Sequence, residues 1–236
     1  MPSISFIVPA LNAQEHVAAT VSTLQEVAAR LAQYEIILVD DGSTDQTGKV
    51  MDDLAASQQN VRVVHNERNL GLGGAYKAGL AAACCDHVMG VWGDNSMPAS
   101  SLTKIIEQVG KADSVISYVV NFHEIKTWPR YFGSIAYTAI LNALFGLRVT
   151  YYNGYAVHRT DLLRKIEITS DGFGFQAEII LKLLRAGHSY VEVGVTSDAE
   201  TSTSSALRVK NLYRVAKVLL HLIRTVPKFH STMNQK

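Results

Sequence analysis

Acidic side chains follow two apolar segments of this chain, at the points where the segments end. Asp40 and Asp41 come directly after residues 35–39, and Asp94 comes just after residues 87–92. The apolar core of each segment is continuous rather than alternating, which predicts buried parallel strands. Because open α/β sheets bind ligands outside the carboxyl ends of their strands, these carboxylates are the first candidates for chemistry.

Carboxylates in these positions suit a phosphorylated ligand. Asp40 and Asp41 can accept hydrogen bonds from the base or ribose of a nucleotide. Asp94 can hold Mg²⁺ or Mn²⁺, which prefer carboxylate oxygens and bridge to phosphates. Both sites also have a simpler interpretation, since Asp, Asn and Ser are common at turns that begin a helix.

A glycine-rich segment, RNLGLGG at residues 68–74, precedes a predicted helix. It does not follow the first strand, so it is not the dinucleotide-binding fingerprint. Its glycines suit either a backbone that cradles a phosphate or close packing on a neighbouring strand. Arg68 could face a phosphate or simply water.

A parallel sheet is needed to bring these turns together. Strands are predicted at residues 4–8, 35–39, 61–64, 87–92 and 114–118, and Pro9 is expected to end the first. Helices are predicted between them at residues 13–33, 46–57, 75–84 and 99–109. This alternation over the first half of the chain predicts a parallel sheet with helices on both faces.

The second half is less regular. Residues 131–147 form a mostly apolar helix that is short for a bilayer span, so we expect a core or interfacial helix. A strand at 149–157 is interrupted at Asn153 and Gly154. A helix at 175–186, a strand at 190–195, a polar loop at 198–206 and a last helix at 207–224 follow.

The last helix combines an apolar stripe with cations. Its apolar residues are Leu212, Val215, Ala216, Leu219, Leu222 and Ile223, and its cations are Arg208, Lys210, Arg214, Lys217 and Arg224. Such a helix can lie on an anionic bilayer, which attracts it by about 1 kcal/mol per cation. It can also pack on the protein's own core, or on a partner membrane protein.

Composition excludes several classes of protein. The chain has 236 residues, 47% apolar and 18% charged, so it is globular, and a net charge of +1 gives no reason to expect nucleic acid. Adjacent Cys84 and Cys85 suit neither a zinc site nor a long-range disulfide, which favours a reducing compartment. We expect no signal peptide and no membrane span. The histidines, His65 among them, lack metal-ligand spacing.

Several blocks together resemble a known family. FIVPALN, VDDGSTDQT, NLGLGGAYKAGL, the Asp94 turn, NGYAVHR and residues 173–195 occur in this order. Over about residues 3–225 the chain resembles the family-2 glycosyltransferases of GT-A fold. Within that family it is most similar to the polyprenyl- and dolichyl-phosphate sugar transferases.

The resemblance implies a single α/β domain of GT-A type, with a mostly parallel central sheet flanked by helices. Residues 1–200 would form this domain, with a nucleotide-binding half at 1–120 and an acceptor-side half at 121–200. Residues 201–236 would form the polar loop and the basic amphipathic helix. The implied reaction is inverting transfer of a hexose from a UDP- or GDP-sugar to a polyprenyl phosphate, assisted by Mg²⁺ or Mn²⁺. It would take place at the cytoplasmic face of the membrane, with the protein bound peripherally.

The resemblance also assigns roles to residues. The implied nucleotide-binding residues are Pro9, Asp40, Asp41, Arg68 and Gly71. Gly154 and Gln176 would contact the sugar or the acceptor. Asp94, as metal ligand, and Glu178 would be catalytic. Glu178 also stands four residues before Lys182, so a surface ion pair is its alternative.

The chain departs from the family pattern in three places. After the first strand it has Asn12-Ala13, with Glu15 two residues later, where the family usually has Asn-Glu. Trp92 replaces the first Asp of the metal-binding Asp-x-Asp. After Val195 the chain has Glu200 and Ser205-Ala206 where the polyprenyl-phosphate enzymes often carry Arg and Ser-Lys. Two alternatives therefore stay open: a transferase with a soluble glycan acceptor, and a degenerate, non-catalytic nucleotide-sugar-binding protein. The oligomeric state is open as well, and a homo-oligomer is compatible with the sequence.

Overall fold

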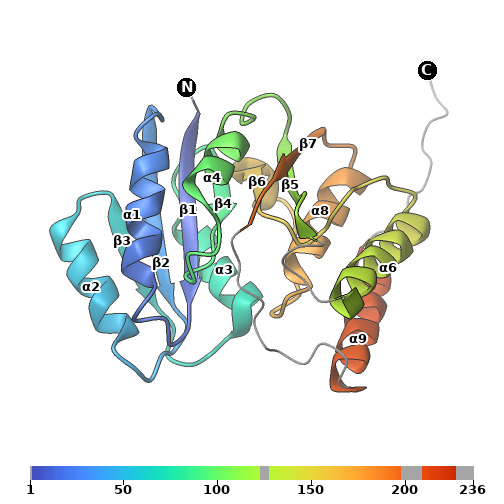
Figure 1. Cartoon of the computed structure of the whole chain (residues 1–236), viewed down its shortest axis with the longest axis horizontal. Helices are drawn as coiled ribbons and strands as arrows, with labels where there is room; N and C mark the ends of the chain where they lie inside the picture. The colour runs from blue at the N-terminus through green and yellow to red at the C-terminus, as the bar shows by residue number, and fades with distance from the viewer. Residues whose placement is uncertain (1, 123–127, 198–208, 227–236) are drawn as a thin grey trace.

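A seven-stranded sheet forms the centre of the molecule, with the strand order β3-β2-β1-β4-β6-β5-β7 (Figure 1). The structure, a computed structural model, describes residues 2–122, 128–197 and 209–226. The strands are β1 (Ser3–Ala10), β2 (Gln33–Asp40), β3 (Val61–His65), β4 (His87–Gly90), β5 (Ser114–Val119), β6 (Ala156–Arg159) and β7 (Tyr190–Val195). All neighbours pair in parallel except β6, which is antiparallel to β4 and β5. The expected mostly parallel sheet is confirmed.

Helices cover both faces of the sheet, as the alternation of elements predicts. They are α1 (Val17–Ala28), α2 (Thr47–Ser57), α3 (Gly71–Ala82), α4 (Ala99–Ile106), α6 (Trp128–Phe145), α7 (Thr160–Leu163), α8 (Phe175–Arg185) and α9 (Val209–Thr225). Residues of α1, α2 and α4 share one core cluster with Phe6 and Leu38. Residues of α3, α7 and α8 share another with Ile7 and Val39. Adjacent strand residues thus serve opposite faces, as the pleat requires.

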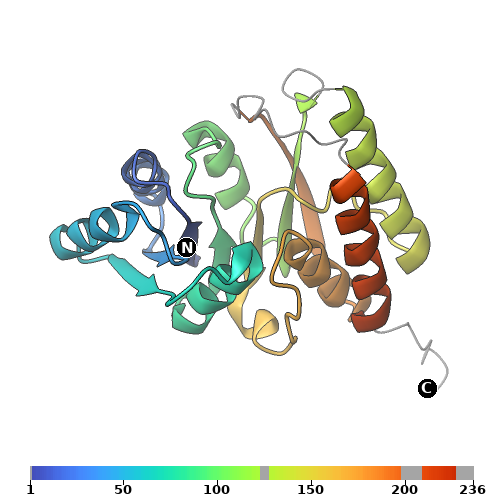
Figure 2. The same cartoon turned by 90° about the horizontal axis from the view of Figure 1, so that it is seen from below.

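A third core cluster lies where α8 meets α6 and α9. It contains Leu141, Ile180, Leu181 and Leu222, all at most 1% exposed. Figure 2 shows α6 and α9 side by side at one end of the molecule, outside the sheet. In the described part of the chain, every helix falls short of the length and apolar character needed to cross a bilayer.

Several boundaries differ from the sequence-based prediction, and three of them bear on the site. Pro9 lies inside β1 and does not end it. Its carbonyl accepts a hydrogen bond from Gly93 N, which lies beyond the end of β4 at Gly90. The nitrogen of Pro9 faces the same side of the strand as its carbonyl. The missing N–H therefore removes no bond from the β1–β4 ladder. The helix α3 begins within the glycines, at Gly71, and β6 begins only at Ala156. The predicted polar loop at 198–206 lies outside the described residues.

Candidate active site

Asp41 organises the glycine-rich turn at the start of α3. Its side chain is 4% exposed, and its Oδ1 accepts hydrogen bonds from Asn66 Nδ2 and Leu70 N, both at 2.9 Å. Its Oδ2 accepts from Gly71 N at 3.0 Å. A side chain at Gly42, where φ is +73°, would place its Cβ 2.7 Å from the backbone of Arg68. The turn after β2 is therefore packed directly on the turn after β3.

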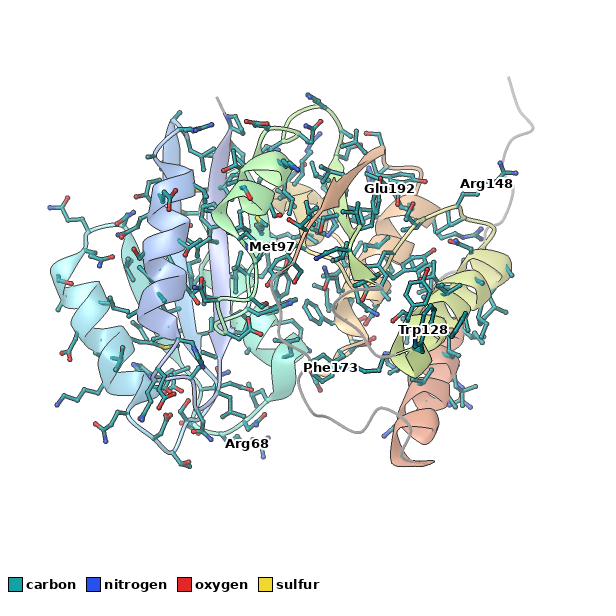
Figure 3. All side chains as sticks on the ribbon, in the orientation of Figure 1. Arg68, Met97, Trp128, Arg148, Phe173 and Glu192 are labelled. Carbon is teal, nitrogen blue, oxygen red and sulfur yellow. The ribbon has the colours of Figure 1, made fainter. Side chains whose placement is uncertain are left out.

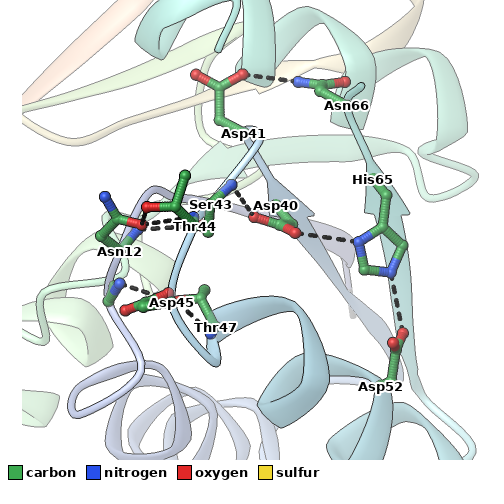
Figure 4. A network of polar contacts seen from close by, with 11 residues as sticks. Asn12, Asp40, Asp41, Ser43, Thr44, Asp45, Thr47, Asp52, His65 and Asn66 are labelled. Carbon is green, nitrogen blue, oxygen red and sulfur yellow. Dashed lines mark hydrogen bonds and ion pairs between the residues drawn. The ribbon is translucent and has the colours of Figure 1, made fainter. Parts of the chain in front are cut away.

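Asp40 points the other way, toward α2 (Figure 4). Its Oδ1 accepts from Ser43 N at 3.0 Å, and its Oδ2 lies 3.2 Å from His65 Nδ1. The second ring nitrogen of His65 lies 3.0 Å from Asp52 Oδ1. Burial alone would raise the pKa of Asp40, but the hydrogen bonds from Ser43 and His65 hold it below its usual value. Asp40 is therefore an anion.

The turns after β1 and β2 are also joined to each other. Ser43 Oγ accepts from Asn12 N at 3.0 Å, and Asn12 Oδ1 accepts from Thr44 N at 2.9 Å. Asn12 has φ +51°, a conformation that Asn tolerates better than most residues. Asp45 accepts from the backbone and side chain of Thr47 at the start of α2. These bonds fix the edge of the sheet in one shape before any ligand arrives.

Asp94 lies on the next turn along the same edge. Gly93 N donates to Pro9 O at 3.3 Å, so this turn packs on the end of β1. The Asp94 side chain is exposed and, among the described residues, accepts one hydrogen bond, from Ser96 N at 3.2 Å. Since β2, β1 and β4 are neighbours in the sheet, Asp40, Asp41 and Asp94 share one carboxyl edge.

Asp94 fits a divalent metal that takes most of its ligands from the substrate. Mg²⁺ is commonly held by one or two carboxylates together with substrate phosphates and water. Trp92, which replaces the first Asp of the family's Asp-x-Asp, packs on Tyr155 and Phe175 with ring centroids 5.7 and 6.1 Å apart. Trp92 is partly buried against the core and offers no carboxylate to a metal.

In the described part of the chain, one group of three side chains has metal-ligand proximity: Glu35, Cys84 and Cys85. Arg62 already bonds the carboxylate of Glu35. A hydrogen bond with Glu35 and burial raise the pKa of Cys84 to about 11, so the thiol keeps its proton. This group lies before β4, at the edge opposite Asp94, and its chemistry disfavours a metal.

The loop at residues 169–174 reaches the glycine-rich turn from the second half of the chain. Asp171 O accepts from Gly73 N at 2.7 Å, and Lys77 Nζ pairs with the Asp171 carboxylate at 2.6 Å. A Cβ at Gly71 would lie 2.7 Å from Asp171 O. The glycines thus allow close backbone packing, one of the two interpretations left open. The Gly71 N–H already donates to Asp41 and is not needed to bind a ligand. Gly71 can therefore affect a ligand only through the shape that it gives the turn.

The glycine-rich segment and this loop each carry one exposed residue, Arg68 and Phe173 (Figure 3). Arg68 is exposed, with no ion pair to any described residue. Phe173 is 81% exposed, although its neighbour Phe175 is buried against Tyr76 with ring centroids 4.9 Å apart. In Figure 3, Phe173 lies between Arg68 and Trp128 of α6.

Glu178 is fully buried on α8 and holds this loop in place. Its carboxylate accepts from Thr169 N at 3.0 Å, Thr169 Oγ1 at 2.7 Å and Ser170 N at 2.8 Å. Lys182 Nζ lies 2.7 Å away, so the pair expected at the surface exists but is buried. Burial raises the pKa of Glu178, but these donors, Lys182 foremost, hold it at about 2.

Gln176 and Gly154 contact each other. Gln176 Nε2 donates to Gly154 O, and both residues are buried. A Cβ at Gly154 would lie 1.9 Å from Ser117 O, so only glycine fits there. This contact joins α8 to the segment before β6.

Sequence reasoning missed the partners of these residues. His65 ends β3 and Asn66 directly follows it, so their place at the carboxyl edge was the available signal. Asp171 had no such signal, because its contact depends on how the second half folds back onto α3.

Comparison with known proteins gives a consistent result. A model of the family described as "Glycosyl transferase family 2" matches residues 5–169. The chain is 32% identical over 200 residues to the undecaprenyl-phosphate mannosyltransferase of Micrococcus luteus, covering 80% of this chain and 81% of that protein. It is 30% identical over 202 residues to the polyprenol monophosphomannose synthase of Mycolicibacterium smegmatis, covering 80% and 75%.

The solved structures agree on the fold. Glucosyl-3-phosphoglycerate synthase from Mycobacterium tuberculosis, in complex with Mn²⁺, UDP and phosphoglyceric acid, superposes with a TM-score of 0.73. The alignment has 20% identity and covers 96% of this chain and 80% of that one.

Proposed function

This chain belongs to glycosyl transferase family 2, and we propose that it moves a hexose from a UDP- or GDP-sugar to a polyprenyl phosphate. The observation that carries the proposal is the carboxyl edge, where the turns after β2, β1 and β4 meet. The family and the GT-A-type fold make the protein a glycosyltransferase. The lipid acceptor is inferred from the two relatives whose names specify it.

The nucleotide would lie along the turns after β1, β2 and β3. We assign its contacts to Pro9, Asp40, Asp41, Arg68 and Gly71. Asp41 and Gly71 set the shape of the turn, and Arg68 offers a cation for the diphosphate. Fixed donors and acceptors bind without reorganisation, which favours the tight positioning that group transfer needs.

The reaction forms one bond and breaks one. An anionic oxygen of the polyprenyl phosphate attacks the anomeric carbon, whose bond to the diphosphate oxygen breaks, so the configuration inverts and the nucleoside diphosphate leaves. Because the attacking oxygen is already charged, no strong general base is required. Asp94 would hold Mg²⁺ or Mn²⁺, which neutralises charge on the leaving diphosphate when bound.

Glu178 acts in this scheme by positioning. Its two oxygens are occupied by Thr169, Ser170 and Lys182, so it holds the loop that carries Asp171 against α3. Gln176 and Gly154 would in turn shape the sugar and acceptor side through their mutual contact.

The acceptor would arrive at the end of the molecule formed by α6 and α9. Between Phe132 and Leu144, every residue of α6 that is exposed to solvent is apolar. Its large exposed side chains are Trp128, Phe132, Ile135, Ile140 and Leu144. On α9, Val215, Leu220 and Ile223 are exposed together with Lys217 and Arg224. An apolar surface with cations at its margin suits the cytoplasmic face of an anionic membrane, where we place the protein.

A transfer assay tests the proposal. The protein is incubated with Mn²⁺ and labelled UDP-glucose or GDP-mannose, with either undecaprenyl phosphate in vesicles or a soluble oligosaccharide as acceptor. We expect label in the lipid fraction with one of the two donors. Label only in the soluble oligosaccharide would replace the lipid acceptor with a glycan. Release of free sugar alone, with no transfer to either acceptor, would contradict the proposal.

A further inference from the structure

His65 stands between two carboxylates at the carboxyl edge of the sheet, and nothing in the proposed reaction uses it (Figure 4). It is the last residue of β3 and pairs in register with Asp40, the last residue of β2. Its Nδ1 lies 3.2 Å from Asp40 Oδ2, and its Nε2 lies 3.0 Å from Asp52 Oδ1 on α2. The side chain of His65 is 46% exposed, so protons reach it freely.

The two contacts define the protonation state of the ring. An ionised carboxylate can only accept a hydrogen bond, so each ring nitrogen of His65 must donate. A ring that donates from both nitrogens is the imidazolium cation. The elements packed on His65 contribute Asp40 from β2 and Asp52 from α2, and in the described part of the chain neither acid has another cationic partner.

The imidazolium of His65 holds the turn after β2 through Asp40. Asp40 accepts from Ser43 N at 3.0 Å, and Ser43 Oγ accepts from Asn12 N at 3.0 Å. The Asp40 carboxylate has little freedom, since a Cβ at Gly48 would lie 2.8 Å from its Oδ2. Loss of the proton would leave the carboxylates of Asp40 and Asp52 without a compensating charge on His65. A diphosphate is itself anionic, so this change opposes its binding.

We propose that protonated His65 is a positioning residue for the nucleotide-sugar donor, holding Asp40 and the turn after β2 and making donor affinity fall as pH rises. This inference rests on the proposed function, because it takes the nucleotide to bind at this edge. It adds a residue and a pH dependence that the family assignment does not contain.

The direction of the pH effect follows from the contacts. The hydrogen bond to Asp52 raises the pKa of His65, desolvation opposes this, and Asp40 raises it further, so the pKa lies above the ordinary 6.5. The contribution of the cation is therefore present at pH values below the ordinary 6.5, and it is lost as pH rises through the higher pKa of His65 in the folded protein. By reciprocity, a bound donor must raise the pKa of His65 in turn.

Calorimetric titration of UDP-glucose and GDP-mannose between pH 5.5 and 8.5 tests the proposal. These diphosphodiesters do not titrate in this range, so the protein supplies the pH dependence. For the donor that binds, we expect affinity to fall about tenfold across the range, as loss of one charge-assisted hydrogen bond would give. His65→Gln should bind at the weaker level throughout, and Asp52→Asn should move the wild-type midpoint to lower pH.

His65→Lys separates charge from shape. It keeps a cation without the ring, and its donor affinity should stay high up to pH 8.5. Thermal unfolding of each variant identifies any that have lost the fold. A wild type that binds the donor equally at all pH values, or a His65→Gln variant that keeps the wild-type pH response, would overturn the role of His65. A wild type that binds neither donor at any pH would overturn the proposed function itself.

Discussion

Asp41 accepts more hydrogen bonds than Asp40 or Asp94, the other two candidate acids at the carboxyl edge. It is buried, and its carboxylate accepts from one side chain and two backbone N–H groups. These donors come from residues 66–71, so one acid fixes the whole passage from β3 into α3. A carboxylate is needed because every partner is a donor.

Asp41→Asn should therefore be destabilising and weaken donor binding. The amide turns one acceptor into a donor that faces N–H groups, and we expect a loss of about 2 kcal/mol in the free energy of unfolding. Urea denaturation measures this loss. Asp53→Asn on the exposed side of α2 is the matched control and should change the free energy by less than about 0.5 kcal/mol. Equal effects of the two substitutions would contradict the role given to Asp41.

Glu178 gives the fold a pH dependence at acidic pH. Its pKa of about 2 lies below the ordinary 4.5, so its contribution is complete above pH 4.5 and is lost as pH falls from 4.5 to 2. Glu178→Gln should lower the stability at pH 7 by about 3 kcal/mol, and the difference from wild type should shrink toward pH 2.

Urea denaturation at pH 7, 4.5 and 3 measures this difference. Glu167→Gln, at an exposed position near the same loop, is the control and should follow the wild type at each pH. A Glu178→Gln deficit that stayed constant down to pH 3 would rule out the carboxylate as its source.

At the scale of elements, α9 has one face in the core and one in solvent. Leu222 is 0% exposed within the cluster shared with α6 and α8, and Leu220 is 47% exposed. Leu222→Ala should cost about 3 kcal/mol, because it leaves a cavity, and Leu220→Ala less than about 1 kcal/mol. Thermal or urea unfolding of both variants checks this. Similar costs would mean that α9 does not dock as described.

The outward face of α6 makes a separate prediction. Replacing Trp128 and Phe132 together by Ser removes two exposed aromatic side chains without touching the core. We expect binding to anionic vesicles to weaken about tenfold or more, since each ring contributes well over 1 kcal/mol of apolar burial. Vesicle flotation measures the bound fraction, and unchanged flotation would remove α6 from the membrane surface.

The sequence predicts elements well where the pattern is local. The strands before Asp40 and Asp94 and the buried positions of α1 follow from runs and spacing alone. The continuation of β1 through Pro9, the start of α3 within its glycines and the late start of β6 do not follow from local pattern. Each depends on a neighbour distant in sequence: Gly93 for Pro9, Asp171 for the glycines, and Ser117 for Gly154.

The site shows the same division. Asp40, Asp41 and Asp94 could be placed at one edge from strand endings, since parallel strands share their carboxyl ends. The sequence predicts that Glu178 is catalytic or paired with Lys182 at the surface. Its burial could not be predicted, because the spacing to Lys182 gives no information on burial. The link between His65 and Asp40 requires the register of β2 and β3, which no single segment encodes.

At the scale of the whole molecule, two regions meet at residues 169–174. This loop contacts the start of α3 through Asp171, and a Cβ at Gly174 would lie 2.7 Å from Val218 of α9. Glu178 of α8 holds the same loop through hydrogen bonds from Thr169 and Ser170. The carboxyl edge and the apolar end formed by α6 and α9 are therefore joined by one short, tightly bonded segment, which would connect the proposed nucleotide site with the proposed lipid site.

The most direct test of this account is calorimetric titration with UDP and GDP, each with and without Mn²⁺, on wild type and Asp94→Ala. The account predicts that one nucleotide binds, that Mn²⁺ strengthens binding about tenfold or more, and that Asp94→Ala loses this gain while Asp53→Ala keeps it. Binding that is indifferent to Mn²⁺ and to Asp94, or no binding of either nucleotide at millimolar concentration, would contradict it.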